Sequence, residues 1–318
     1  MNTATIMILV IACMVLPVAI SLLLEALRRE PRIPVSLYWN KEIPISYITI
    51  DGMNIRYIKT GRGPALVLLH TLRTQLDIFQ KVIPELNKEF TVYALDYPGH
   101  GFSDIPRTDY VPELFVKTVE KFLEALKIEH ATLAGISIGG SIPLLMAAKH
   151  NPHVRNVISI NPYDYGKGRG VERGNLVARL IFSLARIPVV GETVMRFRNR
   201  MVETKILEGG VTGPDALPDQ FLQQVWDSGL RKGHYRGFLN LIRNAAQWEQ
   251  ARRNYTQINI PVLLVYGNRD WSDDNERKRN CDEIPGAKLE TIREGGHFLS
   301  LDQPDEVIRL IKQFAPTA

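Results

Sequence analysis

The sequence predicts an α/β fold in which a mostly parallel sheet carries helices on both faces. Short apolar runs, which are typical of buried strands, alternate along the chain with segments of helical periodicity. One long stretch interrupts this alternation with helical patterns alone, as expected for an insertion that covers the strand ends. An apolar segment at the N-terminus precedes the whole domain and predicts a membrane helix.

The first element is this uncharged N-terminal segment. Residues Thr5 to Leu24 carry no charge, and about 20 apolar residues span a bilayer core. A cleaved signal peptide would begin with a basic region, whereas residues 1–4 are Met, Asn, Thr and Ala. Positive charge follows the segment at once, in Arg28 and Arg29. We therefore expect residues 1–30 to be a retained single-pass anchor, with the rest of the chain in the cytoplasm by the positive-inside rule.

The strands are predicted from apolar or alternating runs and the helices from their periodicity. The predicted strands are Ile45 to Ile50, Met53 to Thr60, Ala65 to His70, Thr91 to Pro98, Ala131 to Ser137, Asn156 to Pro162, Pro261 to Gly267 and Lys288 to Ile292. The predicted helices between them are Leu76 to Leu86, Val111 to Leu126 and Ile138 to His150. Asp51-Gly52 joins the first two strands and signals a hairpin, so this pair should form an antiparallel edge.

The insertion divides the domain into three parts. Residues 31–162 form the first part of the α/β core, 163–258 a helical cap, and 259–318 the second part of the core. The cap segment carries 15 Lys or Arg against 9 Asp or Glu. This excess is interpreted either as a solvated helical face or as a surface that rests on anionic lipid headgroups.

The composition narrows the function classes. With 45% hydrophobic and 23% charged residues, the chain is typical of a folded protein with a sizeable core. Cys13 and Cys281 lie far apart, with no metal-type spacing, so no disulfide framework or metal site is predicted. The net charge of +5 comes without a nucleic-acid-binding motif, and no nucleic-acid partner is expected.

One short motif indicates catalysis. Ser137 lies in Gly135-Ile136-Ser137-Ile138-Gly139, directly between a predicted strand and a predicted helix. This is the context of a nucleophile elbow, in which a sharp turn exposes a serine and small neighbours make room for it. A serine hydroxyl needs a base to become a nucleophile, and the base needs an acid to orient it.

Candidates for the base and the acid follow later strands. His297 comes after the last predicted strand, flanked by glycines, and is the predicted base. Asp270 comes just after the strand ending at Gly267 and is the predicted acid. Both lie where active sites of open α/β sheets collect, at the carboxyl ends of strands. Asp164, after the preceding strand, is the alternative acid, and Asp273 is a weaker one.

An oxyanion hole should complete the site. The backbone N–H of Ile138 begins the helix after the serine and points to where an oxyanion would form. A second donor should come from the loop after the strand ending at His70, where the candidates are the amides of Leu72 and Thr71.

At this point the sequence resembles the α/β-hydrolases with a helical cap. The resemblance covers roughly residues 45–314 and rests on LLHTLRTQLDIF, DYPGHGFSD, GISIGG, YGNRD and GGHF, in the family's order. It implies an α/β-hydrolase fold and a Ser-Asp-His triad of Ser137, Asp270 and His297. The N-terminal helix adds a similarity to membrane-anchored monoacylglycerol-lipase-type esterases.

The sequence departs from relatives at two positions. Thr71 replaces the glycine that family members usually carry after the histidine of the oxyanion loop. The nucleophile position holds Ser137, whereas the related haloalkane dehalogenases and epoxide hydrolases use an aspartate there. The first departure makes the oxyanion hole the least typical element, and the second disfavours dehalogenase and epoxide hydrolase chemistry.

Together these features predict a membrane-tethered serine hydrolase that cleaves carboxylic esters, lipid esters among them, without metal or organic cofactor. Its expected partners are a small-molecule ester or lipid substrate and the membrane, reached through the N-terminal helix. The same residues would also serve an acyltransferase, a thioesterase, a C–C hydrolase or a cofactor-free haloperoxidase. A hydrolase-like module that binds a ligand without catalysis is the alternative from another class. The sequence leaves the oligomeric state open.

Overall fold

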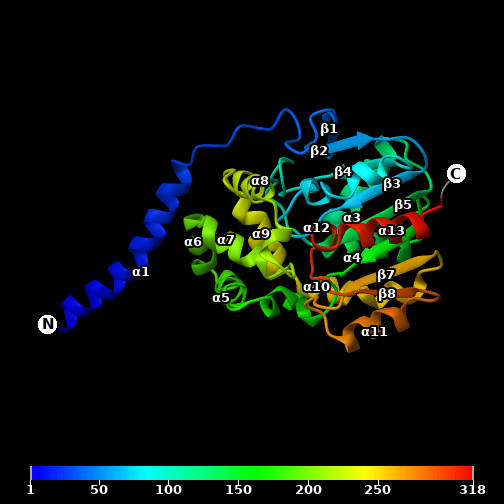
Figure 1. The fold of residues 1–318 in the computed structure, drawn as a ribbon. Helices are drawn as coiled ribbons and strands as arrows, with labels where there is room; N and C mark the ends of the chain where they lie inside the picture. The colour runs from blue at the N-terminus through cyan, green and yellow to red at the C-terminus, as the bar shows by residue number, and fades with distance from the viewer. Residues whose placement is uncertain (1, 317–318) are drawn as a thin grey trace.

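The computed structural model describes residues 2–316, and its centre is an eight-stranded sheet in the order β1-β2-β4-β3-β5-β6-β7-β8 (Figure 1). The strands are β1 (Ile45–Ile50), β2 (Met53–Thr60), β3 (Ala65–Leu69), β4 (Thr91–Leu95), β5 (Ala131–Ile136), β6 (Val154–Ile160), β7 (Val262–Gly267) and β8 (Lys288–Ile292). Strands β3 to β8 pair with one another in parallel, whereas β1 pairs antiparallel with β2, and β2 pairs antiparallel with β4. The predicted α/β fold with a mostly parallel sheet is confirmed.

The antiparallel edge depends on a two-residue turn. Asp51 has φ 49° and Gly52 has φ 77°, the two positive values that a type I′ hairpin turn requires. The turn sets the register that pairs Ile50 with Met53, so β1 returns directly along β2. This hairpin is the predicted one.

Successive side chains of a strand point to opposite faces of the sheet, and each face is buried in its own apolar cluster. In β3, Val67 and Leu69 join one apolar cluster, whereas Leu66 and Leu68 join the other, as the two-residue period of a strand dictates.

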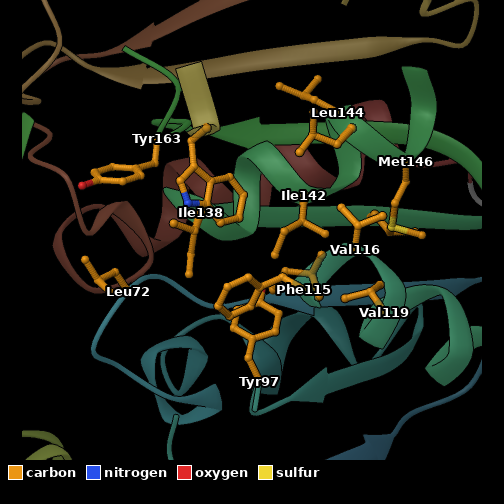
Figure 2. Packing of buried hydrophobic residues seen from close by; sticks show 14 of the residues in the cluster. Leu72, Tyr97, Phe115, Val116, Val119, Ile138, Ile142, Leu144, Met146 and Tyr163 are labelled. Atoms are coloured by element: carbon orange, nitrogen blue, oxygen red, sulfur yellow. The ribbon is translucent and has the colours of Figure 1, made fainter. Parts of the chain in front are cut away.

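The helices of the core cover these two faces. The first cluster is covered by α3 (Pro112–Ala125) and α4 (Ile138–Ala148), and Figure 2 shows Ile142 of α4 beside Phe115 and Val116 of α3. The second is covered by a short 3-10 helix (Leu76–Phe79), α2 (Ile83–Leu86), α12 (Leu299–Asp302) and α13 (Pro304–Phe314). The remaining core helix, α11 (Asp274–Glu283), connects β7 to β8.

Between β6 and β7 the described chain has helices and turns but no strand. The α-helices are α5 (Leu176–Ala185), α6 (Val190–Phe197), α7 (Arg200–Glu208), α8 (Asp219–Gly229), α9 (His234–Arg243) and α10 (Ala246–Ala251). Short 3-10 turns at residues 166–168, 170–173, 214–216 and 252–257 join them. Figure 1 shows α5 to α9 grouped at one side of the sheet, on the side from which α1 projects. We call residues 163–258 the cap.

Helix α1 (Thr3–Ala26) is long and apolar enough to cross a bilayer, with mean hydropathy 3.0 in its 18-residue window. By length and composition alone, a signal sequence near an N-terminus would meet the same criterion. The C-terminal end of α1 contacts the cap. Nη2 of Arg28 donates to the carbonyl of Arg196 at 2.6 Å, and the amide of Gly233 donates to Glu25 at 2.7 Å. These bonds place the end of α1 against α6 and α9.

Candidate active site

Ser137 occupies a strained turn between β5 and α4. Its dihedral angles are φ 61° and ψ −120°, a conformation that is uncommon for a residue with a side chain and is typical of functional sites. Backbone hydrogen bonds hold Ser137 in this conformation. The amide of Ser137 donates to the carbonyl of Ile160 at 2.9 Å, and its carbonyl accepts from the amides of Gly140 and Ser141 at 2.9 and 3.0 Å. The turn is therefore fixed to the carboxyl end of β6.

Two glycines make this turn possible because backbone crosses backbone around it. A Cβ on Gly135 would lie 2.1 Å from the carbonyl oxygen of Gly139, and a Cβ on Gly139 would lie 2.1 Å from that of Leu69. No side chain fits at either distance. The glycines of the motif thus let α4 begin directly above the ends of β3 and β5.

Asp270 and His297 meet at the carboxyl ends of β7 and β8. Oδ1 of Asp270 lies 2.5 Å from Nδ1 of His297, and both side chains are fully buried. The other carboxylate oxygen of Asp270 accepts from the amide and the hydroxyl of Ser272, at 2.9 and 2.5 Å. Nε of Arg277 donates in turn to the Ser272 hydroxyl at 2.9 Å. Each oxygen of the carboxylate therefore has a partner.

These contacts decide the charge state of Asp270. Burial by itself raises the pKa of the carboxyl group, but the neighbouring His297 and the hydrogen bonds from His297 and Ser272 outweigh burial and lower it. Asp270 is therefore ionised at neutral pH and accepts a hydrogen bond from Nδ1–H of His297. The lone pair of the neutral imidazole is then on Nε2.

The alternative acid, Asp164, has partners other than His297. Its carboxylate accepts from the hydroxyl of Tyr255 at 2.9 Å and from Nδ2 of Asn280 at 2.7 Å, whereas His297 bonds to Asp270. Burial raises the pKa of Asp164 against the effect of these two bonds. Asp164 links the start of the cap to its end and to α11. Asp273, the weaker candidate, caps α11 through the amide of Glu276.

Two side chains that the sequence prediction missed hold His297 in place. The indole of Trp271 stacks on its imidazole, with ring centroids 3.8 Å apart and planes at 16°, and its Nε1 donates to the carbonyl of Gly209 at 2.7 Å. Nδ2 of Asn161 donates to the carbonyls of Gly296 and His297, at 3.1 and 2.9 Å. The sequence signal that could have indicated Asn161 is its position directly after β6. The corresponding signal for Trp271 is its position directly after the predicted acid, Asp270.

The serine and the Asp270–His297 pair come to the same edge of the sheet. Ser137 bonds to Ile160 at the end of β6, and the next residue, Asn161, bonds to the backbone of His297. Within residues 2–316, the buried Nε2 of His297 has no hydrogen-bond partner, so its bond to the Ser137 hydroxyl is not formed in this state. Such bonds are often long in ligand-free enzymes and tighten with substrate.

The loop after β3 presents a backbone amide. The carbonyl of Thr71 accepts from Nδ1 of His70 at 2.7 Å and from the Thr74 hydroxyl at 3.1 Å. Burial lowers the pKa of His70 to about 3, and its Nε2 accepts from Tyr97, so the neutral ring donates through Nδ1. Because a trans peptide points its N–H away from its C=O, the amide of Leu72 faces the opposite way.

The three candidate oxyanion donors remain available for a ligand. In the described part of the chain, the amides of Thr71, Leu72 and Ile138 donate no hydrogen bond. Thr71, Leu72 and Ser137 all line one cavity. The left-handed residue of the loop is Arg73, with φ 64°, so the departure from glycine at Thr71 needs no strained backbone there.

The cavity has a volume of about 360 Å³ and a largely apolar wall. Residues of the cap supply most of that wall, including Val171, Ile181, Phe182, Val194, Met195, Val202, Ile206, Leu207 and Phe238. Trp271 and Phe298 line it beside the Asp270–His297 pair. Among residues 2–316 no cluster of three His, Cys, Asp or Glu side chains is arranged to hold a metal ion. The wall suits an acyl or alkyl chain.

Comparison with known proteins agrees with this architecture. An uncharacterized protein of Mycobacterium tuberculosis is 25% identical over 286 residues, which cover 86% of this chain and 81% of the relative. Bifunctional epoxide hydrolase 2 of Sus scrofa is 24% identical over 324 residues, covering 92% of this chain and 58% of the relative. The crystal structure of Cfl2 from Burkholderia cenocepacia superposes with a TM-score of 0.79 at 22% identity, covering 90% of this chain and all of that one.

The profile of the α/β-hydrolase fold matches residues 64–304, from β3 to the start of α13. This match takes in Ser137, Asp270, His297 and the whole cap. The chain therefore belongs to the α/β-hydrolase fold family.

Proposed function

We propose that this protein is a serine hydrolase of carboxylic esters that works through an acyl-enzyme on Ser137. The observation that carries the proposal is the buried Asp270–His297 bond of 2.5 Å beside the cavity that Ser137 lines. An ionised acid bonded to Nδ1 of a histidine leaves Nε2 as a base, and a serine in a strained turn supplies the nucleophile.

In the first step Nε2 of His297 takes the proton of the Ser137 hydroxyl as the oxygen attacks the ester carbonyl. Asp270 stabilises the imidazolium that forms, and the amides of Ile138 and Leu72 stabilise the oxyanion, with Thr71 as the alternative donor. His297 then protonates the leaving alcohol. In the second step His297 takes a proton from the water that attacks the acyl-enzyme, and it returns this proton to the Ser137 oxygen as the acid is released.

The nucleophile separates this reaction from that of the epoxide hydrolase relative. An aspartate that opens an epoxide leaves an ester on the enzyme, which water hydrolyses at the carbonyl. Attack by Ser137 on an epoxide would instead leave an ether, which a histidine and water do not cleave. The serine therefore favours substrates that have a carbonyl, because only an acylated serine can be released by water.

A tether to the membrane completes the proposal. Helix α1 has the length and composition of a bilayer span, and the bonds of Glu25 and Arg28 hold its end against the cap. We propose that α1 is a single-pass anchor with the catalytic domain on the cytoplasmic side. A cap fastened near the bilayer, over an apolar cavity, favours lipid esters as the substrate class.

The proposed chemistry predicts a choice between two electrophiles. The full chain in detergent is incubated with p-nitrophenyl butyrate and octanoate, and separately with styrene oxide. We expect steady multiple turnover of the esters and none of the epoxide, since only the ester yields a hydrolysable intermediate. A catalytic rate on styrene oxide without ester turnover would contradict the proposal.

A further inference from the structure

One charged side chain at the cavity, that of Arg198, has no hydrogen-bond partner among the described residues. Arg198 lies between α6 and α7 and lines the same cavity as Ser137. Its Nε, Nη1 and Nη2 are all buried, and none of the three has a hydrogen-bond partner within the described residues. A buried guanidinium without partners is costly, so natural proteins rarely keep one without a ligand or a function.

The carboxylates near Arg198 are already engaged. Oε1 of Glu203 accepts from Nε and Nη2 of Arg73, at 3.1 and 3.0 Å. Glu25 is paired with Arg28 at 2.9 Å. Each of these acids is therefore paired with a different arginine, and the positive charge of Arg198 at the cavity wall has no matching negative charge.

The surroundings of Arg198 make its positive charge unfavourable. Burial, followed by the like charges of Arg73 and Arg28, lowers the pKa of Arg198 to about 9. The guanidinium is still charged at neutral pH, and an anion beside it would restore the usual balance. A neutral ligand would leave the charge unmatched.

The backbone at Arg198 is also held in an uncommon conformation. Its dihedral angles are φ 42° and ψ 139°, outside the usual regions for a residue with a side chain. Conformations of this kind cluster at ligand clamps and active sites. Here the turn between α6 and α7 places the guanidinium at the cavity wall.

We propose that Arg198 binds an anionic group, a carboxylate or a phosphate, on the part of the substrate remote from the reacting ester. A guanidinium matches the two oxygens of either group with paired hydrogen bonds. Ser137 and Arg198 line the same cavity, whose largely apolar wall suits a hydrocarbon spacer between the two groups of such a substrate. The substrate class is then an ester whose chain carries a negative charge, and Arg198 is its specificity-determining residue.

This inference rests on the proposed function for the identity of the reacting end, but the binding of an anion does not depend on it. A kinetic test uses p-nitrophenyl monoesters of dicarboxylic acids from succinate to sebacate, each beside the p-nitrophenyl ester of the monocarboxylic acid of equal length. We expect a preference for the charged ester of about tenfold or more in kcat/KM at one spacer length, the order that a charged, paired contact supplies.

The variant Arg198→Met should abolish that preference, mainly by raising KM for the charged esters, because the charged contact is lost. Arg198→Lys should retain part of the preference. Arg200→Met is the matched control, since Arg200 is exposed and does not line the cavity, and it should behave as wild type. An equal preference in wild type and Arg198→Met would overturn the inference.

A binding test separates the inference from the proposed function and also distinguishes the two anions. Octyl phosphate, octanoate and octan-1-ol are titrated into full-length Ser137→Ala protein by calorimetry. We expect one of the anions to bind at least tenfold more tightly than the alcohol, and Arg198→Met in the same background to lose that difference.

Each outcome is informative. Anion binding that needs Arg198, in a protein without ester turnover, would keep this inference and remove the proposed function. Ester turnover without any anion selectivity would do the reverse. If Arg198→Met does not fold by circular dichroism, Arg198→Lys and Arg198→Gln decide the question, and equal anion affinity in folded variants and wild type contradicts the assignment.

Discussion

Replacing Ser137 or His297 by alanine is expected to lower kcat for p-nitrophenyl octanoate by about 10⁵- to 10⁶-fold, as in serine hydrolases whose triad acts as a unit. Without Ser137 no acyl-enzyme forms, and without His297 no group accepts the serine proton. Since each residue is useless alone, the double variant should be no slower than either single one.

The control for this prediction is His130→Asn. His130 is exposed and has φ 53°, a left-handed conformation that asparagine tolerates, so the substitution should leave kcat unchanged. Product formation in a stopped assay at saturating ester is measured for the wild type and the four variants, with thermal melting to verify folding. Additive losses in the double variant would mean that Ser137 and His297 act in separate steps.

Asp270→Asn is expected to lower kcat by about 10⁴-fold, whereas Asp164→Asn should change it by less than about threefold. The amide at position 270 removes the negative charge that stabilises the imidazolium and reverses the tautomer of His297. Asp164 has its bonds to Tyr255 and Asn280 instead. Replacing Asp164 should lower the free energy of unfolding by about 1–3 kcal/mol, because a buried hydrogen-bond donor loses its acceptor.

The two aspartate variants are compared in kcat at a pH where the wild type is fully active, and in urea denaturation. The paired result separates a catalytic acid from a structural one. If Asp164→Asn lost more activity than Asp270→Asn while both proteins folded, the assignment of the acid would be reversed.

The sequence alone predicted the sheet and the approach of Asp270 to His297 because these features are local. Ser137, Asp270 and His297 each lie at or shortly after the carboxyl end of a strand, and parallel strands bring these ends to one edge of the sheet. The hairpin at Asp51-Gly52 is likewise a signal of adjacent residues. Asp164 follows a strand in the same way, so position alone did not distinguish it from Asp270.

Features that depend on packing between distant segments were missed. Asn161 holds the backbone of His297 across 136 residues of chain, and the stacking of Trp271 requires the final fold. Arg198 is one of many basic residues of the cap, and its lack of a partner becomes visible only when the carboxylates of Glu203 and Glu25 are placed. No sequence pattern carries that information.

Helix α11 was also not predicted, for a related reason. Its sequence, Asp274–Glu283, is rich in charge and has no apolar periodicity. The helix instead begins with a capping box between Asp273 and Glu276, and its buried residues, Arg277 and Asn280, bind other polar groups. Hydrophobic pattern alone does not detect a helix of this kind.

The assignment of Ser137 as the nucleophile is tested most directly by identifying the residue that reacts with a fluorophosphonate probe. The full-length protein in detergent is labelled, digested and analysed by mass spectrometry, beside Ser137→Ala. One adduct is expected, on the peptide containing Ser137, and none in the variant. An adduct on another residue, or ester turnover that survives in Ser137→Ala, would contradict the assignment of Ser137 as the nucleophile.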